Sequence, residues 1–220
     1  MRRILVAIAI ATALPAPVAF AQDSLSKVNG SVTAEAGKTY SEVSTVNGSV
    51  RIERGATVSG EASTVNGSIT VDDDARLAAA TTVNGALRIA RNAVVEGDAT
   101  TVNGALTVGD GTRVAGSAST VNGRIALEGV EVGGDVRTPA GDIHLAAGTV
   151  VRGDLVVEKP GFSLFSWGNR PEPPRVVIGP DVTVQGELRF EREVRLFVSE
   201  RATVGRISGA EPTRFAGDTP

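Results

Sequence analysis

The chain has 220 residues, no cysteine, one histidine and a formal net charge of −3 at pH 7. The missing cysteines exclude disulfides, thiolate metal sites and a cysteine nucleophile. The charges form no basic cluster of the kind that binds nucleic acid. Aromatic residues make up only 4% of the chain although 41% of it is hydrophobic. This bias toward small and β-branched residues favours strands around a narrow, repetitive interior.

Residues 1–21 have the pattern of a signal peptide. They begin with Arg2 and Arg3, continue through an apolar run too short to span a bilayer, and end in the small-x-small site Ala19–Ala21. We therefore predict export to the periplasm or cell surface, with a mature chain that starts at Gln22. Removing the leader takes away two arginines, so 20 basic and 25 acidic side chains remain, a net charge of −5.

The motif Val-Asn-Gly recurs every 18 or 19 residues. Its copies begin at Val28, Val46, Val65, Val83, Val102 and Val121. From each motif valine, apolar residues follow in alternating steps of four and two, as at Val50, Ile52, Ala56, Val58 and Ala62. A step of two puts both side chains on one face of a strand, and a step of four indicates a corner. Three strand-and-corner units close one triangular coil, with the motif valine facing inward. A glycine in the third corner, such as Gly60, accounts for the coils of 19 residues.

These patterns predict an all-β fold, a single-stranded parallel β-helix (β-solenoid) with triangular coils of 18–19 residues over residues 22–207. Crossovers between parallel strands favour right-handed winding. The repeat is interrupted at about residues 160–175, which we interpret as a loop insertion because the apolar rhythm resumes at Ile178. Residues 208–220 are rich in proline and glycine and are predicted to be a flexible C-terminal tail.

Stacked coils place like residues above one another. We expect one corner to carry a structural ladder of Asn47, Asn66, Asn84, Asn103 and Asn122, next to a ladder of Thr45, Thr64, Thr82, Thr101 and Thr120. Asparagine tolerates the left-handed backbone of a tight corner, and its amide can bond to the coils above and below. Ligand or glycan binding by these asparagines is the alternative. An outward row from Thr33 and Arg51 to His144 never has arginines on adjacent coils, which supports the register.

The aromatic residues Phe162, Phe165 and Trp167 cluster in the insertion, residues 161–174. They pack against the solenoid flank, or they form a loop that docks an envelope polysaccharide or protein partner. The chemistry for catalysis is sparse. His144 is the only histidine and belongs to the outward row, so we assign no catalytic residue, no metal site and no cofactor. The acidic residues Glu61, Asp98, Asp135, Asp154 and Glu187 follow the corner glycine, and of these only Asp135 and Asp154 are expected on neighbouring coils.

With Val-Asn-Gly-x-apolar-x-apolar repeated from Val28 to Ile125 and echoed at residues 182–188, the chain resembles the bactofilin-like, polymer-forming cytoskeletal β-solenoids. It also resembles exported adhesin-like repeat families of bacteria, over roughly residues 25–207. The resemblance implies a right-handed triangular helix that self-associates end to end. The inward step of six is also similar to the hexapeptide pattern of left-handed acyltransferase helices, whose acyl-carrier substrate does not fit an exported chain.

The expected function is therefore a non-enzymatic structural or adhesin-like scaffold of the bacterial envelope, with self-assembly as one route to that role. The alternative is a carbohydrate-binding or carbohydrate-active β-helix protein that uses the outward acidic row, since glycoside hydrolysis requires a pair of carboxyl groups.

Overall fold

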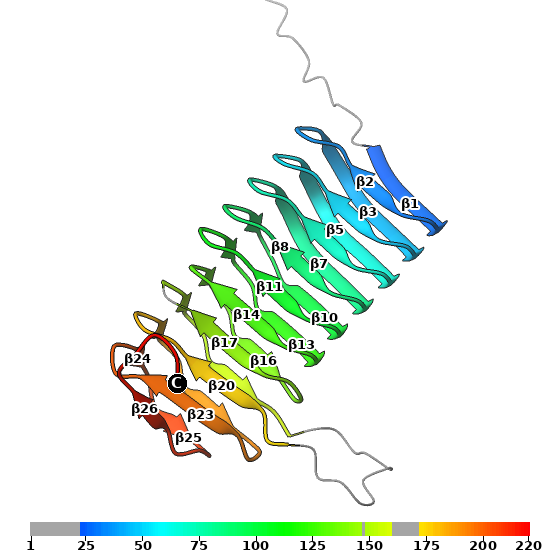
Figure 1. Cartoon of the computed structure of the whole chain (residues 1–220). Coiled ribbons are helices and arrows are strands. Elements are labelled where there is room, and N and C mark those ends of the chain that lie inside the picture. The colour runs from blue at the N-terminus through cyan, green and yellow to red at the C-terminus, as the bar shows by residue number, and fades with distance from the viewer. Residues whose placement is uncertain (1–22, 147, 160–171) are drawn as a thin grey trace, which may run out of the picture.

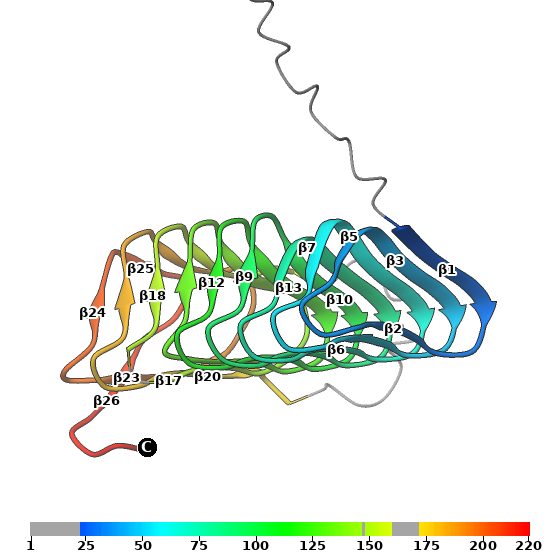
Figure 2. The same ribbon diagram turned by 90° about the horizontal axis from the view of Figure 1, so that it is seen from above.

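The computed structural model describes residues 23–146, 148–159 and 172–220 and confirms the predicted β-solenoid. Within these ranges the regular elements are strands, and there is no helix. Neighbouring strands run parallel and build a stack of about nine turns. Figures 1 and 2 show the turns side by side, from β1 (Asp23–Asn29) at one end to β26 (Thr213–Phe215) near the other. The predicted signal peptide, residues 1–21, lies outside the described residues.

Each turn has three sides, as the alternation of strands and corners predicts. The first side belongs to a ten-stranded parallel sheet. Its strands, in stack order, are β2 (Val32–Ala34), β4 (Val50–Ile52), β6 (Ile69–Val71), β8 (Leu87–Ile89), β11 (Leu106–Val108), β14 (Ile125–Glu128), β17 (Ile143–Ala146), β20 (Arg175–Ile178), β23 (Arg195–Ser199) and β26.

The second and third sides belong to one sixteen-stranded sheet. Near the N-terminus single strands serve both sides; besides β1, these are β3 (Thr39–Asn47), β5 (Thr57–Asn66) and β7 (Arg76–Asn84). Further along, the second side is made by β9 (Val94–Val95), β12 (Arg113–Val114), β15 (Glu131–Val132), β18 (Val150–Val151), β21 (Thr183–Val184) and β24 (Thr203–Val204). The third side is made by β10 (Ala99–Asn103), β13 (Ala118–Asn122), β16 (Val136–Thr138), β19 (Leu155–Val157), β22 (Leu188–Phe190) and β25 (Ile207–Ser208).

The valine of each Val-Asn-Gly motif faces outward, which corrects the predicted inward position. Val46 is 40% exposed, whereas the preceding Thr45 is only 4% exposed. The inward step across this corner is therefore five residues rather than four, for example from Thr64 to Ile69. The threonine hydroxyl can be buried because it has a partner: Thr64 Oγ1 donates to the carbonyl oxygen of Gly48, one turn earlier, at 2.8 Å.

From the second motif onward, the motif glycine permits a close approach between turns, whereas Gly30 in the first motif has a φ of 102° and nothing within 4 Å of an added Cβ atom. A Cβ atom added to Gly85 would clash with the carbonyl oxygen of Gly67, and one added to Gly67 would clash with that of Gly48. None of these three glycines is among the residues with positive φ. The missing side chain itself, rather than conformational freedom, is therefore what the corner requires.

A left-handed backbone occurs instead at the corner between the first and second sides. The residues with positive φ at this corner are Gly37, Gly55, Asp74, Asn92, Gly111, Gly129, Gly148 and Asp181. Glycine, aspartate and asparagine are the types that adopt this conformation at low cost. We expected the ladder asparagines to supply the left-handed corner, and this was wrong because none of them has a positive φ.

Coil length varies at the corner between the second and third sides. The inward step from Val58 to Ala62 is four residues and includes Gly60, whereas the step from Leu77 to Ala80 is three. The strand pairing of β5 with β7 shifts register at the same place. The corner absorbs the extra residue, as predicted, while the inward residues stay in phase.

The solenoid continues across the predicted insertion and into the predicted tail. β19 ends at Val157, and β20 pairs with β17, so the first side resumes after the insertion. Residues 160–171 lie outside the described residues. The prediction of a loose tail over 208–220 was wrong for Thr213–Phe215, because this segment forms β26 and pairs with β23.

At both ends of the described stack, cationic residues stand at register positions that are filled by buried residues in the neighbouring turn. Lys27 pairs with the inward Thr45, and Lys38 precedes Thr39, which pairs with Thr57, so Lys38 lies level with the buried Ala56. At the other end, Arg214 pairs with the fully buried Val198. All three cationic side chains are on exposed residues.

Gly85→Ala should destabilise the protein by about 3 kcal/mol or more, because two turns must separate to admit the methyl group. The control is Gly55→Ala, where nothing lies within 4 Å of the added Cβ atom. Its φ of 66° should limit the cost to about 1–2 kcal/mol. Urea denaturation followed by circular dichroism measures both changes. A smaller loss for Gly85→Ala than for Gly55→Ala would contradict the close-approach explanation.

Candidate functional site

Two uncharged rows run along the third side of the first six turns, and together we call them the hydroxyl–valine face. One of its rows is made by Ser26, Ser44, Ser63, Thr81, Thr100 and Ser119, and the other by Val28, Val46, Val65, Val83, Val102 and Val121. The strand pairing places successive hydroxyl residues side by side, for example Ser44 with Ser63. Neither row contains a charged residue.

Exposed apolar side chains gather on this face. The large hydrophobic residues that are exposed in the described part of the chain are Val28 (67%), Val46 (40%), Val65 (41%) and Val121 (42%). Valine is stiff at χ1 because it is branched at Cβ, and the turns repeat at about 4.8 Å. The face is therefore a rigid, periodic surface rather than an adaptable one.

The asparagine ladder forms one edge of the hydroxyl–valine face. Each amide Nδ2 donates to the Oδ1 of the asparagine one turn earlier, at 3.0 Å from Asn47 to Asn29 and 2.9 Å from Asn66 to Asn47. The same bonds join Asn84, Asn103 and Asn122 into the row. The asparagine row ends at Asn122, because the residue that pairs with it on the next turn is Ala140. In that next turn, the buried hydroxyl of Thr138 has no hydrogen-bond partner.

The acidic row begins at the opposite edge of the face, with Glu61 and Asp98, and continues along later turns with Asp135, Asp154 and Glu187. Several of its carboxylates bind neighbouring turns. Oδ1 of Asp98 accepts the backbone N–H of Ser117 at 2.7 Å, and Oδ1 of Asp135 accepts that of Asp154 at 2.7 Å. Oδ1 of Asp154 accepts the N–H of Glu187 at 2.8 Å. Glu187 therefore follows Asp154 on the next turn, an adjacency that the sequence interpretation missed because the insertion lengthens the spacing between them.

Asp135 stays ionised in this arrangement. Burial raises the pKa of its carboxyl group, but hydrogen bonds from the Arg137 side chain and the Asp154 backbone N–H outweigh burial and hold the pKa below its ordinary value of 3.8. The acid of a glycosidase pair must instead be protonated, with a raised pKa. The carboxylate of Asp135 therefore fits a structural role between turns better than a catalytic role.

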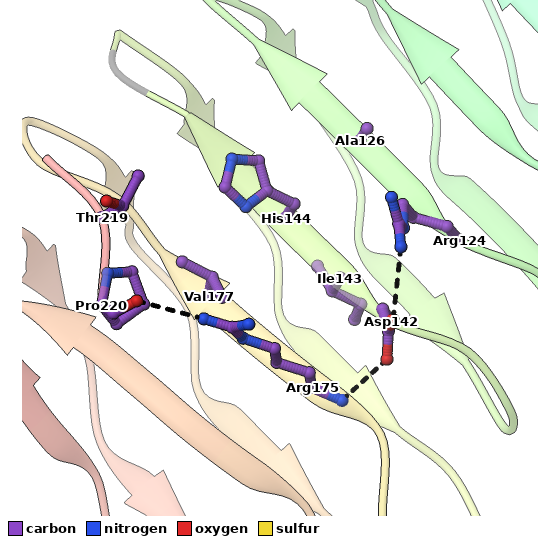
Figure 3. A pocket seen from close by; sticks show the side chains of 9 residues that line it. All are labelled: Arg124, Ala126, Asp142, Ile143, His144, Arg175, Val177, Thr219 and Pro220. Carbon is purple, nitrogen blue, oxygen red and sulfur yellow. Dashed lines mark hydrogen bonds and ion pairs between the residues drawn. The ribbon is translucent and has the colours of Figure 1, made fainter.

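A second candidate site is a groove of about 270 Å³ on the first side, which we call the C-terminal groove (Figure 3). It lies over β14, β17 and β20 and is bordered by Thr219 and Pro220. His144 and Val177 line it, and these two residues are paired neighbours on β17 and β20.

Three charged groups organise the C-terminal groove. Asp142 Oδ2 lies 3.7 Å from Nη2 of Arg124, and Asp142 Oδ1 accepts the backbone N–H of Arg175 at 2.8 Å. The Arg175 guanidinium donates to the carbonyl oxygen of Pro220 at 3.4 Å and lies 5.0 Å from the centre of the Phe197 ring. Arg124 and Arg175 thus already have partners in Asp142 and the Pro220 oxygen, so the charges in the groove are largely paired with one another. The groove does not offer the paired nucleophile and base that covalent catalysis needs.

The described residues hold no group of three or more His, Cys, Asp or Glu side chains that could bind a metal ion. Among the same residues, no helix is long and apolar enough to cross a membrane. Comparisons with protein-family models, with curated proteins and with solved structures found no match. The resemblance to bactofilin-like and adhesin-like families thus remains a resemblance of repeat pattern.

The structure forms both predicted ladders. The asparagines run in a row on the outside of the corner, and the threonines run in a buried row next to them. His144 is exposed on β17, in the outward row that was predicted. The aromatic residues Phe162, Phe165 and Trp167 lie outside the described residues, and their docking role stays a prediction. The C-terminal groove was missed, because Arg175 reaches Asp142 only after the insertion and no local motif marks the pair.

The Asp135 carboxylate should make stability depend on pH. A carboxyl group whose pKa is lower in the folded state stabilises the fold above its ordinary pKa of 3.8, and the stabilisation is lost as pH falls through the folded value. Asp135→Asn should therefore weaken the fall in thermal transition temperature between about pH 5 and pH 2. Arg137→Gln should weaken it less, because the Asp154 N–H remains. An unchanged pH profile in Asp135→Asn would contradict the assignment.

Proposed function

We propose that this chain is a non-enzymatic, exported structural scaffold of the bacterial envelope, with an adhesin-like role in which a rigid periodic face meets a partner. The observation that carries the proposal is the hydroxyl–valine face: two outward rows without charge, repeated over six turns, that hold the exposed large hydrophobic residues of the described chain. Apolar exposure concentrated in one patch is typical of an interaction surface.

The use of the polar side chains supports a structural role. Threonine hydroxyls such as that of Thr82 bind glycine carbonyls, and amides such as that of Asn84 bind the preceding asparagine. The carboxylates of Asp135 and Asp154 bind backbone N–H groups. Groups that could perform chemistry are largely committed to contacts between turns, which leaves shape and surface pattern as the properties that the molecule can present.

The same contacts weigh against the carbohydrate-active alternative. Asp135 and Asp154 are adjacent, as the alternative requires, but each of them accepts a backbone hydrogen bond from the next turn. A binding role for the acidic row is not favoured over its role in holding turns together.

Fractionation of cells that express the tagged chain tests location, and mass spectrometry of its N-terminus tests cleavage. We expect the chain in the envelope fraction, with an N-terminus at Gln22. A cytosolic chain that retains residues 1–21 would overturn the proposal.

Incubation of the purified chain with envelope polysaccharides tests the absence of catalysis. We expect no soluble products, and the double variant Asp135→Ala, Asp154→Ala should differ from the parent only in stability, because its carboxylates hold turns together. Product release by the parent that the folded double variant loses would show an enzyme.

A further inference from the structure

We infer that the hydroxyl–valine face is the contact surface for a second copy of this chain, so that two rods associate side by side with their stacks parallel. The inference rests on the proposed scaffold function and names the partner of its face. It also selects lateral association over the end-to-end association that the resemblance implies.

The ends of the stack oppose end-to-end association. A further turn placed on the first turn would enclose Lys27 and Lys38, which lie level with the buried Thr45 and Ala56. A turn placed on the last described strand would enclose Arg214 in the same way. Lys38 already forms an ion pair with Glu35, and the Lys27 ammonium donates to the carbonyl oxygen of Ser31. The cost of enclosure therefore falls mainly on Lys27 and Arg214, because burying a charged ammonium or guanidinium group is costly. Lateral contact through the hydroxyl–valine face buries none of these cations.

The order of the rows across the face favours parallel stacks. A twofold rotation about an axis parallel to the stack reverses the strand direction but keeps the turns level. It places the hydroxyl row of one copy opposite the valine row of the other, so that Ser63 faces Val65 of the second copy. Each valine methyl then packs beside a small side chain of similar height, which is the complementarity that a tight sheet contact needs.

The two edges of the face complement each other under the same rotation. The asparagine edge of one copy meets the opposite edge of the other, where Glu42, Glu61 and Asp98 are exposed and alternate with uncharged residues. The ladder uses one of the two N–H groups on each amide, and the second can donate to a carboxylate. A rotation about an axis along the strands would instead place acidic edge on acidic edge, and like charges in contact repel.

The size of the face predicts a weak pair. Six turns at about 4.8 Å and five residues at about 3.3 Å give a face of roughly 29 by 17 Å. A pair would therefore bury roughly 1,000 Å² in total, about the minimum for a specific interface. We expect reversible association in free solution, which becomes stronger where many copies share one surface.

Sedimentation equilibrium of the purified chain over a range of concentrations tests the association. We expect a reversible monomer–dimer equilibrium, and Val65→Asp should weaken it by more than about tenfold because the change buries two like charges in an uncharged contact. The control, Thr107→Asp, adds the same charge to the outward row of the first side and should leave the equilibrium unchanged. A monomer at every concentration, or a dimer that Val65→Asp does not weaken, would overturn the inference.

Cross-linking tests the orientation, since the chain has no native cysteine. In parallel stacks, Val28→Cys of each copy faces Ser26 of the other, so the two cysteines lie diagonally across the contact at the same turn and should react with a short bifunctional thiol reagent. In antiparallel stacks, Val28→Cys would meet Val121→Cys, five turns or about 24 Å away along the stack. Preferential cross-linking of the mixed pair, or filaments one rod wide in electron micrographs, would contradict parallel lateral pairing. Neither result depends on location in the cell, so failure here is distinct from failure of the envelope role.

Discussion

The structure depends on the hydrogen bonds that each turn makes with the turns on either side of it. The backbone N–H of Val50 bonds to the carbonyl of Ser68 at 3.0 Å, and that of Ile69 bonds to the carbonyl of Ala86 at 3.0 Å. Buried backbone groups that lose such partners are costly, so every turn must keep nearly the same outline. This requirement explains why the sequence repeats most strictly at the Asn-Gly corner, where two backbones approach too closely for a side chain.

Polar side chains reinforce the same stack. The asparagines, threonines and several aspartates run in rows, and each member bonds to the turn before or after it. Because these polar groups bond to adjacent turns, the surface that is left to contact other molecules consists of the outward rows on each side. On the third side of the first six turns these rows are uncharged and partly apolar, and this contrast with the charged rows elsewhere is the basis of the proposed scaffold role.

The fold could be read from the sequence because one period controls it, but the period alone does not settle which residues face inward. Thr45 and Val46 are adjacent and both fit a strand; the valine is the more hydrophobic, yet the threonine is buried because its hydroxyl finds a glycine carbonyl one turn away. That partner is invisible in a single repeat. The C-terminal groove was unpredictable for a related reason, since Asp142 and Arg175 become neighbours only when the insertion is bypassed.

Residues one repeat apart should lie one strand spacing apart along a straight stack. Spin labels on cysteines at positions 33 and 144, six turns apart in the outward row of the first side, should be separated by roughly 29 Å, and labels at positions 51 and 126, four turns apart, by roughly 19 Å. Pulsed electron resonance measures both distances in the same chain. Distances in this ratio support the stack, whereas equal distances, or a shorter distance for the pair six turns apart, would contradict it.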